Sequence, residues 1–378
     1  MDTTQIKRTI QSHIEEQLFK GKIIIVYGAR QVGKTTLVKA IQKKQTVKNI
    51  YLNCDEPDIR LALTDKTSTE LKLFFGDNKL VIMDEAQRVK NIGLTLKLIA
   101  DNFPGIQIIA TGSSSFDLSN KIVEPLTGRK IEFYLYPFSL GELKSVYSEI
   151  EINRILETRM IFGMYPEIAL SGGDLGDKLK ALARSYAYKD VLQYQNIKNP
   201  EILEKLLQAL ALQVGNEVSY NELSSFVGAD KITVASYIQI LEKAFVIFRL
   251  GPFSRNLRNE LKKTRKIYFY DNGIRNALIN NLNLLDLRQD TGALWENFMI
   301  SERIKLNNNF QNDASFYFWR TLQKQEIDLI EDYQGVIAGF EFKWGKKFGK
   351  VPIAFSRAYP DAKVQTVNPD NYQKFLNL

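Results

Sequence analysis

The chain has 378 residues, a net charge of +8, 44% hydrophobic residues, one cysteine and one histidine. This length exceeds what a single hydrophobic core usually supports, so we expect several domains. The lone Cys54 excludes an internal disulfide, and with only His13 beside it no Cys/His zinc site is possible. The first twenty residues lack the apolar run of a secretory signal, and no apolar run approaches the length of a membrane span, so we expect a cytoplasmic protein without a membrane partner.

Residues 1–142 are predicted to form an α/β core. Short β-branched runs alternate with amphipathic or polar stretches, the order expected of a parallel sheet with helical crossovers. The predicted strands are 22–28, 49–55, 79–85, 106–112 and 130–136.

The first predicted strand leads into a segment that matches G-x-x-x-x-G-K-T and is followed by a helical run. The segment consists of Gly28, Ala29, Arg30, Gln31, Val32, Gly33, Lys34, Thr35 and Thr36. The glycines let backbone amides turn toward phosphates, Lys34 neutralises the β- and γ-phosphates, and Thr35 offers a hydroxyl to Mg²⁺. We therefore predict that this segment binds ATP with Mg²⁺.

The third predicted strand ends in two acids, Asp84 and Glu85, after four apolar residues. Asp84 is expected to hold Mg²⁺, and Glu85 to orient and polarise the attacking water. An extra strand is expected between this strand and the one that precedes the P-loop. The alternative is that Glu85 is a plain carboxylate at a strand end.

Two further residues are candidates for sensing the nucleotide. Ser113, or its neighbour Ser114, follows the fourth predicted strand and is expected to report the γ-phosphate; a serine-rich turn is the alternative. Arg129 is the candidate arginine finger, acting in its own or a neighbouring subunit, with an ordinary surface arginine as the alternative.

After the core we predict a helical lid over 143–198 and a winged-helix domain over 199–285, with three helices and a two-stranded wing. Helix 230–243 is the element expected to face DNA. Its polar side is predicted to comprise Lys231, Thr233, Ser236 and Gln239, and its apolar side Ile232, Ala235, Ile238 and Leu241. Six cations between Arg255 and Lys266 also favour a polyanionic partner. Winged helices serve as protein-interaction modules too, so that alternative stays open.

Six motifs occur in order along the chain: GARQVGKTT, VIMDEAQ, ATGSSS, LTGRKIEFYLYPFSLGEL, GMYPE and KIYFYDNGIRNAL. They resemble those of a bacterial and archaeal family of AAA+-type ATPases that carry a C-terminal domain of unknown function. The resemblance covers nearly the whole chain. It implies an AAA+-like core, a winged-helix segment and a restriction-endonuclease-like end, and it supports the roles given to Lys34, Thr35, Asp84, Glu85, Arg129 and a sensor near Ser113.

Residues 286–378 are predicted to form this last domain, with an αβββαβ order. Asp328 and the Glu341-Phe342-Lys343 segment stand on successive predicted strands and resemble the D-x(n)-E-x-K core of PD-(D/E)XK nucleases. Two carboxylates can bind Mg²⁺, Lys343 can position water, and Glu296 on the preceding helix is a further candidate acid. A domain that binds without cutting is the rival, because this pattern is short and arises by chance.

The combined prediction is a homo-oligomeric, Mg²⁺-dependent ATPase that acts on DNA and couples ATP hydrolysis to movement of the winged-helix and nuclease-like regions. The alternative is a nucleotide-gated switch or scaffold that binds a protein partner and carries an inactive nuclease-like domain.

Overall fold

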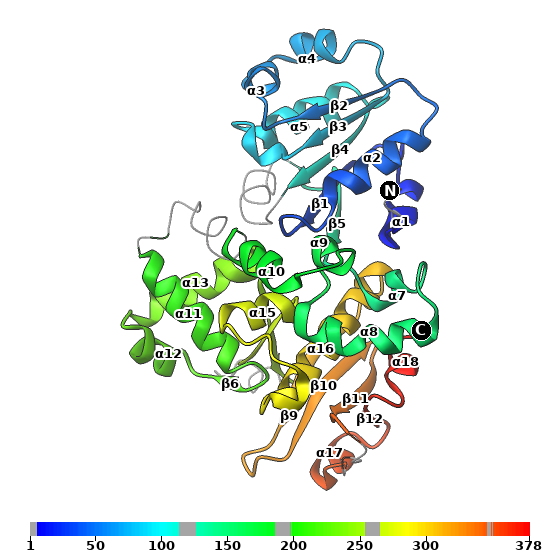
Figure 1. Ribbon diagram of the computed structural model, residues 1–378. Coiled ribbons are helices and arrows are strands. Elements are labelled where there is room, and N and C mark those ends of the chain that lie inside the picture. Colours follow the sequence, from blue (N-terminus) through cyan, green and yellow to red (C-terminus); the bar gives the residue numbers. More distant parts are fainter. Residues whose placement is uncertain are drawn as a thin grey trace. The chain divides into compact units, whose positions relative to one another are not determined.

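The computed structural model describes residues 6–112, 126–185, 197, 199–253, 265–345, 349 and 351–378 (Figure 1). The chain divides into two compact units. The first contains residues 1–136 with 243–245, and the second contains residues 137–242 with 246–378. In the part of the chain so described, no helix is both long and apolar enough to traverse a bilayer.

The first unit is built on a parallel five-stranded sheet with the order β2-β3-β4-β1-β5 (blue to green in Figure 1). Its strands are β1 (Ile23–Gly28), β2 (Asn49–Asn53), β3 (Leu80–Asp84), β4 (Gln107–Gly112) and β5 (Lys130–Leu135). All five predicted strands are confirmed. The inner strands β1, β3 and β4 are buried along their whole length, as expected of parallel strands covered on both faces. The expected extra strand between β1 and β3 is present, and it is β4.

Short helices connect these strands. They are α2 (Lys34–Lys44), α3 (Pro57–Leu63), α4 (Ser68–Phe75), the 3-10 turn η1 (Ala86–Arg88) and α5 (Ile92–Asn102), and a further helix, α1 (Ile10–Glu16), precedes β1. Because every connection returns the chain to the same end of the sheet, the carboxyl ends of β1, β3 and β4 lie side by side. This edge positions the residues of the predicted nucleotide site.

The second unit contains a mixed seven-stranded sheet with the order β12-β11-β10-β9-β7-β8-β6. Its strands are β6 (Glu217–Val218), β7 (Ile247–Pro252), β8 (Arg265–Phe269), β9 (Ser315–Arg320), β10 (Glu326–Tyr333), β11 (Val336–Phe342) and β12 (Lys363–Val367). The predicted wing, β7 and β8, is an antiparallel pair, and β7 also pairs in parallel with β9. One sheet therefore continues across the boundary predicted at 285/286. The domain boundaries themselves stay predictions.

The helices of the second unit follow the predicted order. They are α7 (Leu140–Leu143), α8 (Glu149–Phe162), α9 (Pro166–Ala169), α10 (Leu175–Ala183), α11 (Pro200–Leu212), α12 (Tyr220–Val227), α13 (Lys231–Lys243), α15 (Asn272–Leu278), the 3-10 turn η3 (Leu285–Leu287), α16 (Thr291–Asn309), α17 (Ile353–Ala358) and α18 (Tyr372–Phe375). The αβββαβ order predicted for the C-terminal segment is present as α16, β9, β10, β11, α17 and β12.

The helices predicted as a lid pack within the second unit, where α8 and α10 contact α15. Gly163 follows α8 with a φ of 81°, and a Cβ there would lie 2.1 Å from Oδ1 of Asp271. Asp271 in turn accepts hydrogen bonds from the backbone N–H groups of Met164 (2.6 Å) and Ile274 (3.0 Å). The end of α8 and the start of α15 therefore fit together only because residue 163 has no side chain.

The predicted apolar side of helix 230–243 is wrong at Ile232, whose exposed fraction is 81%. The carboxylate of Asp230 accepts hydrogen bonds from the N–H groups of Ile232 and Thr233, which places Ile232 in the first, outward-facing turn of α13. The residues of α13 that are buried are Val234, Tyr237, Ile238, Ile240 and Leu241.

Candidate functional site

The P-loop joins the end of β1 to the start of α2. Gly28 lies so close to β5 that a Cβ there would be 2.3 Å from the carbonyl oxygen of Leu135. Gln31 and Gly33 have φ values of 61° and 97°, so the chain makes two left-handed turns before α2 begins at Lys34. Left-handed residues turn successive N–H groups toward one point, which is how backbone loops bind anions. The loop from Gly28 to Gly33 therefore has a backbone conformation suited to binding an anion.

Lys34 is buried and folded back over this loop. Its Nζ donates hydrogen bonds to the carbonyl oxygens of Gly28 (3.1 Å) and Ala29 (2.9 Å), and it lies 3.9 Å from Oε1 of Glu85. The ammonium group is thus fixed between the P-loop and the acidic end of β3. This is the position from which a lysine can contact phosphates bound by the same loop.

Asp84 and Thr35, the two residues predicted to serve Mg²⁺, are in direct contact. The Thr35 hydroxyl donates a 2.6 Å hydrogen bond to Oδ2 of Asp84. A hydroxyl and a carboxylate are hard oxygen ligands of the kind that Mg²⁺ prefers, so this donor pair fits that ion. Two residues that the sequence analysis missed also donate to Asp84: Tyr51 to Oδ2 at 2.6 Å, and Thr111 to Oδ1. Both are hydroxyl residues close to the carboxyl ends of strands that neighbour β3, which is the signal that would have found them.

Glu85 has an unusual backbone conformation for a residue with a side chain, with a φ of 55°. Its N–H donates to the Thr111 hydroxyl at 3.0 Å, so Thr111 contacts both acids, and its Oε2 accepts a 2.5 Å hydrogen bond from Nε2 of Gln87. Left-handed residues other than glycine cost about 1–3 kcal/mol and cluster at functional sites. The glutamate is therefore held in one orientation by its backbone and by Gln87.

Arg129 lies at the other end of the sheet from the P-loop. Ile23 is opposite Lys130 and Gly28 is opposite Leu135, so the start of β5 and the end of β1 are separated by the length of the strand, roughly 16 Å at about 3.3 Å per residue. Its Nε is 2.6 Å from Oδ1 of Asp101. Within its own chain Arg129 is therefore not part of the nucleotide site. Ser113 and Ser114 lie outside the described residues.

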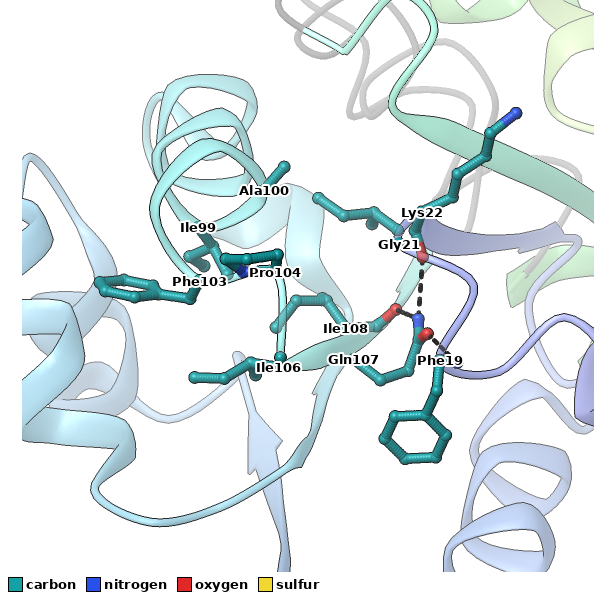
Figure 2. A pocket seen from close by; sticks show the side chains of 12 residues that line it. Phe19, Gly21, Lys22, Ile99, Ala100, Phe103, Pro104, Ile106, Gln107 and Ile108 are labelled. Carbon is teal, nitrogen blue, oxygen red and sulfur yellow. Dashed lines mark hydrogen bonds between the residues drawn. The ribbon is translucent and has the colours of Figure 1, made fainter.

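A pocket opens at that same far edge, where β1 and β4 begin (Figure 2). Phe19, Ile99 and Phe103 line it, and the side-chain amide of Gln107 is held by the backbone of Phe19 (2.6 Å) and Lys22 (3.0 Å). Its position, at the end of the sheet opposite the P-loop, excludes it as the place where the P-loop binds phosphates.

The four residues of the predicted second site converge in the second unit. Nζ of Lys343 is 3.1 Å from Oε2 of Glu341 and 3.9 Å from Oδ2 of Asp328. Asp328 also accepts a 2.8 Å hydrogen bond from the N–H of Phe342. Burial and the charge of Asp328 raise the pKa of Glu296, on α16, from 4.5 to about 7. These residues form an acidic cluster beside β10 and β11.

The wing strand β8 adds residues to this cluster that the sequence analysis did not place there. The buried Lys266 forms ion pairs with Glu296 at 3.3 Å and with Glu326, and the Tyr268 hydroxyl donates to Glu296 at 2.7 Å. Burial lowers the pKa of Lys266, but Glu296, Asp328 and Glu326 outweigh it and raise the pKa above the ordinary value. Lys266 therefore does not contribute to a DNA-binding surface. The other cations of the 255–266 stretch lie outside the described residues, except Arg265.

The position of Lys266 changes what the acidic cluster offers to a metal ion. Across the described part of the chain, no group of three or more His, Cys, Asp or Glu side chains is arranged to hold one. Glu296 and Glu326 are engaged by Lys266, which leaves Asp328 and Glu341 as the acids beside Lys343. The alternation of side chains along β8 places Lys266 and Tyr268 on one face, the signal that would have identified them.

Comparison with known proteins agrees with the two units. Residues 20–144 match the family described as AAA domain. Residues 153–285 and 291–371 match two families described as domains of unknown function, DUF8612 and DUF4143. Neither description names a winged helix or a nuclease, so those two interpretations stay predictions.

Similar proteins occur in several organisms. An uncharacterized protein of Methanocaldococcus jannaschii is 27% identical over 385 residues, covering 96% of this chain and 84% of its own. One from Mycobacterium tuberculosis is 24% identical over 342 residues, covering 89% and 74%, and one from Haemophilus influenzae is 24% identical over 283 residues, covering 68% and 69%. Residues 20–144 are thus similar to the AAA domain family, and the two segments that follow are similar to families of unassigned function.

Proposed function

We propose that this protein is a Mg²⁺-dependent ATPase whose nucleotide site is formed by the P-loop and the acidic end of β3. The observation that carries the proposal is the convergence of Lys34, Thr35, Asp84 and Glu85 at one edge of a parallel sheet that matches the AAA domain family.

The residues divide the chemistry among them. The P-loop amides and Lys34 bind and neutralise the phosphates, and Thr35 and Asp84 hold Mg²⁺. The bound ion supplies positive charge that stabilises the transferring phosphoryl group. Glu85 orients the attacking water and takes its proton on Oε1, because Oε2 is occupied by Gln87.

Nucleotide binding tests the proposal directly. We expect the purified wild-type protein to bind a fluorescent ATP analogue in the presence of Mg²⁺ and Lys34→Met to lose this binding by on the order of 100-fold. Lys44→Met is the matched control, because Lys44 lies on the same helix and makes a surface ion pair with Glu15 at 2.8 Å. Equal affinity of Lys34→Met and the wild type would overturn the proposal.

If Arg129 is the arginine finger of this ATPase, the protein must act as a homo-oligomer. Because Arg129 lies at the far end of its own sheet, it can reach only a nucleotide bound by another subunit. We expect Arg129→Ala to lower turnover without weakening nucleotide binding. If subunits share sites, turnover should rise when Arg129→Ala chains, which keep Glu85, are mixed with Glu85→Gln chains, which keep Arg129. If turnover does not increase when Arg129→Ala chains are mixed with Glu85→Gln chains, Arg129 does not act on the nucleotide of a neighbouring subunit.

Action on DNA through the second unit is the second candidate function. It is favoured by the contact of Lys343 with both Glu341 and Asp328. In this reading Asp328 and Glu341 hold Mg²⁺, and Lys343 positions the water that attacks a phosphodiester. The test is cleavage of linear and branched duplexes with Mg²⁺ or Mn²⁺, with Lys343→Ala as the variant expected to lose it. ATP turnover that rises with DNA, together with salt-sensitive DNA binding, would support a DNA-directed ATPase even without cleavage.

A protein partner is the alternative, and the exposed apolar residues of the predicted winged helix favour it. Phe226, near the end of α12, is 64% exposed, and Ile232, in the first turn of α13, is 81% exposed. Apolar side chains at this position suit a protein surface better than phosphates. This alternative predicts no stimulation of ATP turnover by DNA, and a stable complex with another polypeptide that Ile232→Ser weakens.

A further inference from the structure

The carboxylate of Asp84 is held by three hydroxyl groups from three different strands or helices. Thr35 of α2 and Tyr51 of β2 both donate to Oδ2, each at 2.6 Å, and Thr111 of β4 donates to Oδ1. Three donors leave the carboxylate group little freedom to rotate about its Cβ–Cγ bond. Its orientation is therefore set before any ion arrives.

The three donors are not equivalent once Mg²⁺ binds. In a P-loop the Thr35 hydroxyl becomes a ligand of the ion, and so it can no longer be relied on to orient Asp84. Thr111 contacts only Oδ1, and its hydroxyl also accepts from the N–H of Glu85. Tyr51 is then the remaining neutral donor to Oδ2. Oδ2 is the carboxylate oxygen that faces the P-loop, because Thr35 donates to it.

Tyr51 is itself held firmly. It lies in β2, paired in register with β3 so that Asn53 is opposite Asp84. The ammonium of Lys39, on α2, lies 4.5 Å from the centre of its ring, within the range of a cation–π contact. A tyrosine hydroxyl carries its proton at physiological pH, so Tyr51 can donate to Asp84 throughout.

We infer that Tyr51 is a positioning residue for magnesium: its hydroxyl fixes Oδ2 of Asp84 so that the carboxylate is ready to hold the ion when Thr35 turns to it. The inference rests on the proposed ATPase function. Tyr51 acts through Asp84 and takes no part in the chemical step.

The test compares Tyr51→Phe with the wild type as Mg²⁺ is titrated. Tyr27→Phe is the matched control, because Tyr27 lies in the same sheet and donates its hydroxyl to Glu132 at 3.2 Å. Binding of a fluorescent, non-hydrolysable ATP analogue is measured from EDTA to saturating Mg²⁺, and turnover is measured over the same range. The EDTA arm reports whether the P-loop is intact independently of the ion.

We expect the half-saturating Mg²⁺ concentration to rise about tenfold in Tyr51→Phe, the effect of losing one hydrogen bond to a charged group. Binding in EDTA and turnover at saturating Mg²⁺ should stay within about threefold of the wild type, and Tyr27→Phe should have the wild-type Mg²⁺ dependence. A wild-type Mg²⁺ dependence in Tyr51→Phe overturns the inference alone, as does an equal shift in Tyr27→Phe. A wild-type protein that binds no nucleotide overturns the proposed function as well.

Discussion

The nucleotide site and the acidic cluster both combine lysines with carboxylates, but they are assembled differently. The first uses one continuous loop, residues 28–36, and two adjacent acids at the carboxyl end of β3. The second draws on β8, α16, β10 and β11, which are spread from Lys266 to Lys343 along the chain. A site made from a contiguous loop can be recognised as a motif, whereas a site made from four separate elements exists only once they pack together.

The two sites also neutralise their acids differently. Asp84 is oriented mainly by hydroxyl groups, which are neutral and can give way to an ion. In the cluster, Glu296 and Glu326 are paired with the charged ammonium of Lys266, a side chain that is almost fully buried. The donors around Asp84 are therefore neutral groups that an ion can displace, whereas the negative charge of the acidic cluster is partly neutralised by a lysine of the protein itself.

The largest effect is expected for Lys266→Met, which tests the internal neutralisation. Removing a buried partner leaves Glu296 and Glu326 without their cation, so we expect the free energy of unfolding to fall by about 3–5 kcal/mol. Lys343→Met is the control, because the Lys343 side chain is 41% exposed, and it should cost about 1 kcal/mol or less. Urea denaturation of both variants measures these changes in the free energy of unfolding. Similar decreases in the two variants would contradict the different roles assigned to the two lysines.

Glu85→Gln tests whether the first site exchanges and hydrolyses its ligand. The amide keeps the size of the side chain but cannot take a proton from water, so turnover should fall by on the order of 100-fold while nucleotide binding is kept. Turnover is measured by phosphate release and binding by titration with the ATP analogue. Unchanged turnover would assign Glu85 to a structural role at the end of β3.

Gly28→Ala tests the backbone component of the nucleotide site. The added Cβ would lie 2.3 Å from the carbonyl oxygen of Leu135, so β1 and β5 must separate, and we expect a loss of stability of about 1–3 kcal/mol. Gly105→Ala, where a Cβ would meet nothing within 4 Å, is the control. Thermal unfolding with and without Mg·ATP measures both effects, and equal behaviour of the two variants would contradict the close approach.

The smallest effect is a pH dependence that belongs to the acidic cluster. The pKa of Glu296 is raised from 4.5 to about 7, with burial as the first cause. Between these values the folded protein keeps a proton that the unfolded chain has lost, so this contribution to stability is fully present below pH 4.5 and is lost as the pH rises to about 7. Glu296→Gln removes it.

Unfolding measured without divalent metal between pH 4.5 and 7.5 tests this. The melting temperature of Glu296→Gln, relative to the wild type, should increase as the pH rises. A constant difference would show that Glu296 does not titrate in that interval.

A residue's position could be predicted from the sequence only where it does not depend on distant parts of the chain. Helix α13 was predicted from its periodicity, yet Ile232 was assigned to the wrong side, because Asp230 sets where the first turn points. Arg129 was identified at the start of a strand, but only the pairing of β5 with β1 shows that this start is far from the P-loop. Tyr51 lies in none of the quoted motifs, and Thr111 lies in ATGSSS, where only the serines were given a role; the contacts of both with Asp84 emerge only from the neighbours that the sheet order provides.

The amino-acid sequence by itself determined the strands of both sheets except the two-residue β6, together with the P-loop motif and the pair Asp84-Glu85, because strand periodicity and loop motifs are encoded over a few consecutive residues. Only the tertiary structure decided that β4 separates β1 from β3, that the wing strands continue into the C-terminal sheet, and that Lys266 lies among the acids. These features depend on contacts between residues far apart in the chain, and short-range patterns do not contain that information.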